Sequence, residues 1–349
     1  MNGVAPPTGI LPDTSRLAPP VQVGSEWCLG DHLGALGVRL NVRRMSYRVT
    51  PGLVAFGSPG PEAPVLVSAN YKLSFDHLRR ALSGLHAWIL VLDTQGVNVW
   101  CAAGKGTFGT EELIRRIREC RLEERVIHRR LILPQLGAPG VAAHEVKKQT
   151  GFTVVYGPVY AADIPAFIRA GFHATPAMRR VRFQWRDRLV VAPVELVIGF
   201  RRMLLAGLIL AGLAGVSAQG FSLSTAWHLG GAAFLLWCLS YLLACLLGPL
   251  LLPWLPTRAF SIKGAALGLV LAAGGAWAAS PNWPTLRMTA WFLVVTAGVS
   301  HLLLTFTGAT TFTSPSGVRR EVRLALPAQI AAGIVGLVFW LMAGLFPTG

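Results

Sequence analysis

The sequence contains few acidic residues, and nearly all of them lie in its first part. Of 16 Asp and Glu residues, 15 fall within residues 1–200 and only Glu321 follows. Charged residues make up 14% of the chain and hydrophobic residues 53%, which is more apolar than most soluble proteins. So few carboxylates beyond residue 200 disfavour a transporter that moves protons or cations along a chain of buried acids. The composition instead predicts a soluble domain followed by a membrane domain.

Cysteine is also scarce, and its spacing shows no disulfide or metal-site pattern. The chain has no CxxC motif, and its five cysteines are Cys28, Cys101, Cys120, Cys238 and Cys245. An odd number at unrelated spacings disfavours a disulfide framework and a zinc ribbon, so we expect reduced thiols on the cytoplasmic side. The N-terminus lacks the basic and apolar regions of a signal peptide, and residues 1–40 are predicted to form a disordered, proline-rich arm.

Nucleic-acid binding is not indicated, although the net charge is +16. The sequence has no basic stripe interleaved with aromatic residues, which would be typical of a nucleic-acid surface. Much of the excess charge flanks apolar segments, where membrane topology explains it. Residues 179–202 are predicted to form a basic linker at the lipid headgroups of a bilayer, and the run Arg179–Arg188 could alternatively dock an acidic ferredoxin.

Five apolar segments approach the roughly 20 residues needed to cross a bilayer. They lie at about 203–219, 229–248, 264–280, 288–306 and 326–346. Lys and Arg concentrate before the first segment, between the second and third, and between the fourth and fifth, whereas the opposite side offers only Arg287. The charge rule therefore predicts a multi-pass inner-membrane protein. Its soluble domain would be cytoplasmic, residues 203–349 would form an all-α transmembrane bundle of five helices, and the C-terminus would lie outside.

Small residues within these segments predict close helix packing. They recur every four positions at Gly207, Ala211 and Gly215, and again at Gly264, Gly268 and Ala272. His301 is the main ionisable residue inside the segments, and we expect it to form a hydrogen bond between helices. Cys238 and Cys245 share a helix face and could pass a soft metal along, but two small packed residues are the favoured interpretation.

Residues 41–178 alternate between strand and helix patterns. Strands are predicted at 65–71, 88–93, 130–137 and 152–159, and helices at 74–82, 109–120, 142–151 and 163–171. Buried strands joined by helices are typical of a parallel, Rossmann-like α/β sheet, in which ligands bind beyond the carboxyl ends of the strands. Residues after the strands are therefore candidate contacts, although ordinary turn chemistry would also explain the glycines. They are Thr94, Gln95, Gly96, Gln135, Gly137 and Gly157.

The segment NVWCAAGK, residues 98–105, follows the second predicted strand and contains a lone cysteine, Cys101. Asn98 is a preferred N-cap residue, so we expect a short helix whose first positions are Val99, Trp100 and Cys101. Free backbone amides and the helix dipole favour negative charge at such a position, so they favour the thiolate, which binds metals and attacks electrophiles.

The rest of this segment is small or basic. Ala102, Ala103 and Gly104 would leave room for a broad ligand, Trp100 could pack against a flat one, and Lys105 could add a cation on the same helix face. Two other interpretations stay open at this point. The cysteine could be a buried core residue, or it could be a nucleophile whose base is His86, His128 or His144.

The segment also resembles a motif of a known family. NVWCAAGK matches, position by position, the cap-helix motif N-(V/I)-W-C-A-(A/G)-G-K of the corrinoid proteins of mercury methylation, the HgcA family. GTFGTEE at 106–112, FSIKG at 260–264 and FTGATTFTSPSGV at 306–318 are similar to that family as well, and so is the order of the domains. The resemblance covers nearly the whole chain beyond the first forty or so residues.

The resemblance implies that residues 41–178 bind a cobalamin whose own base is detached. The cap helix would supply Cys101 as the lower axial ligand of cobalt, with its neighbours shaping the helix. Because the corrin ring provides four nitrogens, a lone cysteine would need no companion ligands. A soft sulfur opposite a cobalt-bound methyl group favours transfer of that methyl to an electrophile such as Hg(II).

The implied function is therefore a cobalamin-dependent methyltransferase that forms methylmercury from Hg(II). Implied partners are a ferredoxin-like 4Fe–4S protein that donates electrons and a folate- or pterin-dependent methyltransferase that donates the methyl group. Related corrinoid iron–sulfur proteins carry a cysteine-rich cluster segment, which this sequence lacks. Two alternatives remain, a corrinoid protein that passes methyl groups to another acceptor and a cobalamin carrier or sensor without catalysis.

Overall fold

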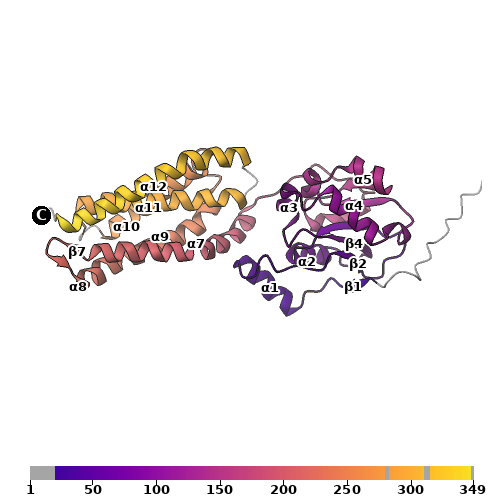
Figure 1. Ribbon diagram of the computed structural model, residues 1–349, viewed down its shortest axis with the longest axis horizontal. Helices are drawn as coiled ribbons and strands as arrows, with labels where there is room; N and C mark the ends of the chain where they lie inside the picture. The colour runs from indigo at the N-terminus through magenta and orange to yellow at the C-terminus, as the bar shows by residue number, and fades with distance from the viewer. Residues whose placement is uncertain (1–19, 280–282, 310–314, 347–349) are drawn as a thin grey trace, which may run out of the picture. The chain divides into compact units, whose positions relative to one another are not determined.

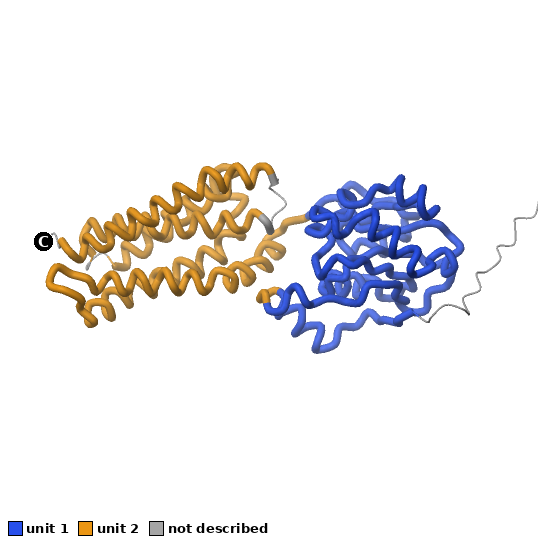
Figure 2. The backbone as a smooth tube through the Cα atoms, viewed as in Figure 1, with its two compact units in different colours: residues 1–38, 42–181 blue, residues 39–41, 182–349 orange. Residues whose placement is uncertain are grey.

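The computed structural model describes residues 20–279, 283–309 and 315–346. The chain divides into two compact units (Figure 2), of which the first comprises residues 1–38 and 42–181 and the second residues 39–41 and 182–349. The first unit is an α/β domain and the second is a set of long helices (Figure 1). The predicted fold class is confirmed.

A six-stranded sheet forms the centre of the first unit. Its strands are β1 (Val21–Val23), β2 (Gly52–Phe56), β3 (Val65–Ala69), β4 (Ala87–Leu92), β5 (Arg130–Leu133) and β6 (Thr153–Tyr156). Their order across the sheet is β1-β2-β4-β3-β5-β6. β2 runs antiparallel to β4, and all other neighbouring strands are parallel. The carboxyl ends of β3, β4, β5 and β6 therefore meet at one edge of the sheet, where α/β proteins bind ligands.

Helices cover both faces of this sheet (Figure 1). The helices of this unit are α1 (Leu29–Arg39), α2 (Lys72–Ala81), α3 (Val99–Lys105), α4 (Thr110–Glu119), α5 (Ala143–Thr150) and α6 (Ile164–Arg169), with short 3-10 helices η1 (Leu122–Glu124), η2 (Gln135–Gly140) and η3 (Ala161–Asp163), and all of the α-helices except α1 pack against the sheet. Because side chains alternate along a strand, Val65 and Val67 face the core shared with α3, α4 and α5, whereas Leu66 faces the core shared with α2 and α6. Every residue of β3 and β4 is buried, which explains their unbroken apolar pattern.

The alternation of strands and helices predicted over residues 65–171 is confirmed, with ends shifted by a few residues. The structure differs before residue 65, because β1 and α1 lie within the predicted arm and β2 was not predicted. β1 is short and mostly exposed, and three leucines of α1 point outward, so neither element has the pattern of a buried strand or helix. Residues 1–19 of the predicted arm lie outside the described residues.

A buried cluster of charges attaches α1 to α2. Lys72 Nζ lies 2.7 Å from Asp76 Oδ2 and also pairs with Asp31 of α1. Arg79 joins the same two carboxylates, with Nη2 2.5 Å from Asp31 Oδ2 and Nε 2.8 Å from Asp76 Oδ1. Burial by itself would raise the pKa of Asp31, but hydrogen bonds from Lys72 and from the backbone N–H of Cys28 outweigh it and hold the pKa well below its ordinary value of 3.8.

This cluster predicts that acid releases α1. A carboxylate whose pKa is lowered in the folded state stabilises the fold above its unfolded pKa, and this contribution is lost as the pH falls through the folded pKa. We expect cleavage within α1 by an acid-active protease to accelerate as the pH falls below about 4. Asp31→Asn should be cleaved readily at pH 5 as well, with a flatter pH profile. An unchanged profile in this variant would assign the acid sensitivity to other groups.

The second unit contains five helices that are long and apolar enough to cross a membrane. They are α7 (Trp185–Ala214), the continuous segment of α8 (Leu223–Thr225), the π-helical turn η4 (Ala226–Gly230) and α9 (Gly231–Leu251), then α10 (Phe260–Ala279), α11 (Thr285–Thr305) and α12 (Pro315–Leu345). Minor elements are β7 (Val216–Ser217), β8 (Gly220–Phe221) and η5 (Phe306–Ala309). These helices coincide with the five predicted segments and are compatible with a multi-pass membrane protein. α7 begins before residue 203, so much of the predicted basic linker is helical.

Glycines of the predicted small-residue stripes lie where these helices touch. A Cβ atom at Gly264 of α10 would lie 2.7 Å from Ser300 Cα of α11, and one at Gly207 of α7 would lie 2.7 Å from the ring of Phe234 in α9. Larger residues would push the helices apart, so the predicted role of the stripes in close packing is confirmed.

Polar contacts inside this unit follow the interpretations made from the sequence. His301 Nδ1 lies 3.2 Å from Gln329 Oε1, which is the expected hydrogen bond between helices. Cys238 Sγ lies 3.4 Å from Met203 Sδ, and Cys245 is buried in the helix core. Among the described residues, no group of three or more His, Cys, Asp or Glu could hold a metal ion.

Candidate functional site

The loops after β3, β4, β5 and β6 lie at one edge of the sheet, and two short helices stand there. α3 follows the loop after β4, and η2 follows β5 directly. The two helices pack against each other. They bring the NVWCAAGK segment to the edge at which the sequence predicts a ligand.

Asn70, directly after β3, organises the neighbouring loop after β4. Its side chain is buried, and its Oδ1 accepts hydrogen bonds from the backbone N–H of Thr94 at 3.1 Å and of Gly96 at 3.0 Å. Its Nδ2 donates to Asp93 Oδ1 at 3.1 Å. One asparagine therefore fixes the loop that leads into α3, since a buried Asn side chain is stable only when its polar atoms have partners.

The same loop has a left-handed backbone at two positions. Gln95 has φ 56° and Gly96 has φ 75°, and a Cβ atom at Gly96 would lie 2.7 Å from the backbone oxygen of Met45. Position 96 therefore requires glycine. Of the three rim residues predicted here, Thr94 and Gly96 are buried and shape the loop, and only Gln95 is exposed.

A carboxylate of α4 fixes the end of β4. Glu112 Oε1 accepts a hydrogen bond from the backbone N–H of Asp93 at 2.8 Å and pairs with Arg116 Nη2 at 2.9 Å. Burial by itself would raise the pKa of Glu112, but these partners outweigh it and lower the pKa below its usual range. Glu112 is therefore a structural anion, and it is held at the base of the loop.

α3 begins where the sequence predicts. Asn98 has an extended backbone, and its Oδ1 accepts a hydrogen bond from the backbone N–H of Cys101 at 2.9 Å. The helix ends at Gly106, which has a left-handed φ of 82°. A side-chain cap and a glycine stop thus define a helix of only seven residues, and Cys101 lies on its first turn.

α3 turns one face to the core and the other to solvent. Ala102 and Ala103 are buried, so they support the helix and do not provide the ligand-facing space that the sequence analysis assigned to them. The exposed residues are Trp100, Cys101, Gly104 and Lys105. A Cβ atom at Gly104 would have no neighbour within 4 Å, so the surface around the thiol is open.

Two glycines allow η2 to pack closely against α3 and the segment that follows it. A Cβ atom at Gly140 would lie 2.1 Å from the backbone oxygen of Phe108 and 3.1 Å from Ala103 Cα. At Gly137 it would lie 2.5 Å from the Phe108 ring. Gly137 therefore has a packing role, and the position of α3 depends on the absence of side chains at both glycines.

A pocket of about 380 Å³ opens at the same edge of the sheet. Residues of β3, α2, the start of α3 and the loops after β5 and β6 line it, and its walls are mostly apolar. Small-molecule sites commonly combine such walls with a few polar groups. Four of the predicted site residues line it, namely Asn98, Val99, Trp100 and Gly157.

The other predicted residues lie around the pocket. Cys101 is outside its lining, next in the chain to Trp100. Gln135 Oε1 accepts a hydrogen bond from Arg179 Nη1 at 2.8 Å, which ties η2 to the end of the first unit. The structure thus brings together the first turn of α3 and Gly157, but it does not bring Gln135 or Gly137 into the pocket.

Sequence reasoning missed four polar residues that line the pocket. They are Ser68 near the end of β3, Ser74 and His77 on α2, and Tyr160 after β6. The signal for two of them was present, since Ser74 and His77 are three residues apart and so share one face of the predicted helix. The predicted contacts came only from the loops after the strands, and Tyr160 in one such loop was not among them.

The histidines considered as bases do not pair with Cys101. Within the described residues, their ring nitrogens have other contacts: His86 with the backbone N–H of Ser58, His128 with the carbonyl of Ala63 and His144 with the carboxylate of Glu145. The structure therefore gives no support to a Cys-His nucleophile. Cys120 packs against the core at the end of α4, where burial raises the pKa of its thiol, as expected of a core cysteine.

Comparison with known proteins gives matches to the first unit. Residues 41–168 match the family of the CO dehydrogenase/acetyl-CoA synthase delta subunit. The acetyl-CoA decarbonylase/synthase complex subunit gamma of Archaeoglobus fulgidus is 33% identical over 127 residues, which are 36% of this chain and 27% of that protein. The corrinoid/iron-sulfur protein large subunit of Moorella thermoacetica is 30% identical over 125 residues, 35% of this chain and 28% of that protein.

The similarity is confined to part of each protein. The chain spans 27% and 28% of the length of these two relatives, little more than a quarter. The family match lies within the α/β unit, and it contains α3, η2 and the strand-end pocket. Residues 41–168 therefore form a domain similar to that of the corrinoid iron–sulfur proteins.

Proposed function

We propose that the first unit binds cobalamin and that the protein transfers a methyl group to Hg(II), forming methylmercury. The observation that carries this proposal is the exposed thiol of Cys101, on the first turn of a capped helix beside a strand-end pocket. The similarity of residues 41–168 to corrinoid iron–sulfur proteins supports a corrinoid ligand. The likeness of NVWCAAGK to the mercury-methylation family supports Hg(II) as the acceptor.

The donor groups of the site fit a cofactor that brings most of its own ligands. No cluster of metal-binding side chains surrounds Cys101 in the described part of the chain, so the protein would supply a single sulfur. A corrin would bring its own nitrogen ligands for cobalt, so the protein would need to supply only the sulfur of Cys101. The mostly apolar pocket, lined by Trp100 and Gly157 among others, fits the tail and detached base of such a cofactor.

The chain itself would hold the sulfur ligand and keep its surroundings open. Asn98 Oδ1 accepts the backbone N–H of Cys101 and so fixes the first turn of α3, which holds the thiol at the exposed surface. The exposed Gly104 adds no side chain that would obstruct a flat ring at Cys101. Cobalamin bound here would supply the methyl group, and an electron-rich sulfur ligand from Cys101 would favour transfer of that methyl group to a soft cation.

The second unit would hold this domain at the inner membrane. The distribution of Lys and Arg supports a cytoplasmic first unit and an external C-terminus. In that position the site would be accessible to soluble proteins. We propose a ferredoxin-like 4Fe–4S protein as electron donor, because the sequence has no cysteine-rich cluster segment, and a folate- or pterin-dependent methyltransferase as methyl donor.

The test is methylmercury formation together with cofactor binding. We expect the protein purified without oxygen to bind cobalamin with the absorption of a base-off, thiolate-ligated form, and cells to methylate Hg(II) only when they carry the gene. Failure to bind cobalamin would overturn the proposal. If the protein binds methylcobalamin but forms no methylmercury when a methyl donor and a reductant are supplied, the result would favour a protein that methylates another acceptor or a cobalamin carrier without catalysis.

A further inference from the structure

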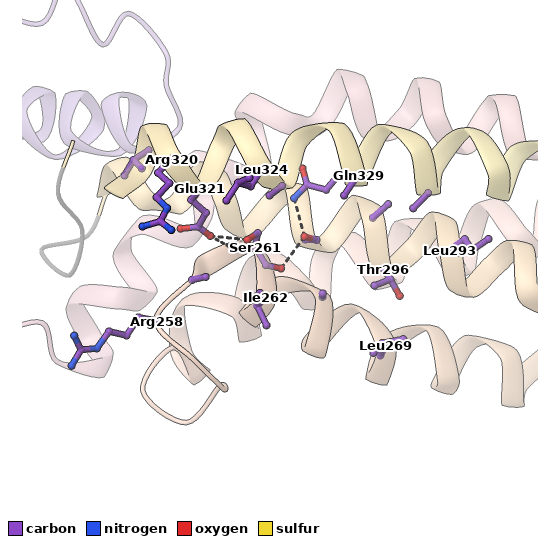
Figure 3. A pocket seen from close by; sticks show the side chains of 18 of the residues that line it. Arg258, Ser261, Ile262, Leu269, Leu293, Thr296, Arg320, Glu321, Leu324 and Gln329 are labelled. Atoms are coloured by element: carbon purple, nitrogen blue, oxygen red, sulfur yellow. Dashed lines mark hydrogen bonds between the residues drawn. The ribbon is translucent and has the colours of Figure 1, made fainter. Parts of the chain in front are cut away.

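A groove of about 820 Å³ runs along the second unit between α10 and α12 (Figure 3). Both helices pack against α11, whose Phe292 and Leu293 contribute to the floor of the groove. Ile262 and Leu269 of α10 and Leu324 of α12 line its sides, and each is at least 50% exposed. The groove is therefore apolar and open on the outer surface of helices that are long enough to span a membrane.

The length of the groove corresponds to one leaflet. Its lining on α12 extends from Gly317 to Ala332, which is about 22 Å at roughly 1.5 Å per helical residue. Half of a bilayer of about 40–45 Å, with the headgroup regions included, is about 20–22 Å. A single acyl chain that enters from one leaflet and lies along the helices therefore matches this surface.

One end of the groove is basic. Arg258 and Arg320 line this end, and both are exposed (Figure 3). The carboxylate beside them, Glu321, accepts hydrogen bonds at Oε1 from the backbone N–H of Ser261 at 2.6 Å and from its hydroxyl at 2.8 Å. Glu321 of α12 thus provides the hydrogen-bond acceptor for the first turn of α10. Among the described residues, neither Arg258 nor Arg320 forms an ion pair with a carboxylate.

Hydrogen bonds between the three helices fix the groove near this end. The Ser300 hydroxyl of α11 donates to the backbone oxygen of Ser261 in α10 at 2.8 Å. Gln329 Nε2 of α12 donates to Ser300 Oγ at 2.8 Å (Figure 3). The polar residues below the arginines are therefore engaged with one another, and the charge of the groove end comes from Arg258 and Arg320.

We propose that this groove binds one anionic phospholipid, with its phosphate at Arg258 and Arg320 and one acyl chain along α11. A phosphate would be an anionic partner for these two arginines, and the planar guanidinium group can donate two hydrogen bonds to phosphate oxygens. The apolar sides accept the chain. The charge rule predicts that this end faces the cytoplasm, where anionic lipids attract basic groups.

The test uses the full chain in nanodiscs of phosphatidylcholine with a minor fraction of phosphatidylglycerol, released into native mass spectrometry. We expect one retained phosphatidylglycerol per wild-type chain. The double variant Arg258→Gln/Arg320→Gln should bind it more weakly, by on the order of 30-fold for two arginines. Ala328→Trp, which fills the groove and keeps both arginines, should also lose the lipid.

Arg319→Gln/Arg323→Gln is the matched control. It removes the same number of charges, two, from exposed positions of α12 that flank Arg320 but lie outside the groove lining, and it should retain the lipid. The proposal is overturned if the control loses as much lipid as the groove variant, or if phosphatidylcholine is retained equally. It is also overturned if the wild-type chain is released as a dimer that Ala328→Trp dissociates, because a second copy would then occupy the groove.

Discussion

Replacing Cys101 by alanine is expected to abolish methyl transfer to Hg(II) while the protein still binds cobalamin. The thiol is exposed on α3 and outside the lining of the pocket, so its loss removes the proposed cobalt ligand without removing the contacts of the pocket. Substituting even the partners of metal ligands costs about 10–100-fold, so we expect activity to fall by more than roughly 100-fold. Absorption spectra and a methylmercury assay on the same preparation measure both properties.

Cys28→Ala and Cys120→Ala are the matched controls for this variant. Cys28 is an exposed thiol away from the pocket lining, and Cys120 is a partly buried thiol in the core near α4. Both variants should keep the thiolate-ligated spectrum and the activity. If Cys101→Ala keeps the wild-type spectrum, sulfur ligation by Cys101 is wrong, even if the protein binds cobalamin.

The sequence predicts much of the site because the chemistry of α3 is local. The cap at Asn98, the first-turn position of Cys101 and the glycine at the helix end are set by residues within nine positions of one another. Propensity rules apply directly to such a segment. The buried strands were equally clear, since β3 and β4 are apolar throughout and are covered on both faces.

What the sequence analysis missed depends on contacts between distant segments. Asn70 positions the loop after β4 from the end of another strand, and no local pattern in the sequence indicates that contact. β1 and α1 are held by pairing with β2 and by charges on α2, so their own residues look like an exposed arm. Ala102 and Ala103 were assigned to the ligand side because helix faces cannot be oriented without knowing that η2 lies beneath α3.

Gly140→Ala is the second variant for which we expect a large effect, because it displaces the helix that carries the thiol. The added Cβ atom would lie 2.1 Å from the backbone oxygen of Phe108 and 3.1 Å from Ala103 Cα, so α3 or η2 must move. Overpacking of this kind costs about 1–3 kcal/mol. We expect faster amide hydrogen exchange in α3 and η2, and weaker cobalamin binding. Exchange measured by mass spectrometry and a binding titration test the two effects.

Gly60→Ala is the control, because a Cβ atom there has no neighbour within 4 Å. It should change neither exchange in α3 nor binding. Comparing Cys101→Ala with Gly140→Ala then distinguishes the role of Cys101 as cobalt ligand from the role of η2 in positioning α3. Cys101→Ala should keep the cofactor and lose the thiolate spectrum, whereas any cofactor that remains on Gly140→Ala should keep that spectrum. If Gly140→Ala shows the same hydrogen exchange and cobalamin binding as the wild-type protein, η2 does not position α3. Cofactor binding would then have to depend on the pocket alone.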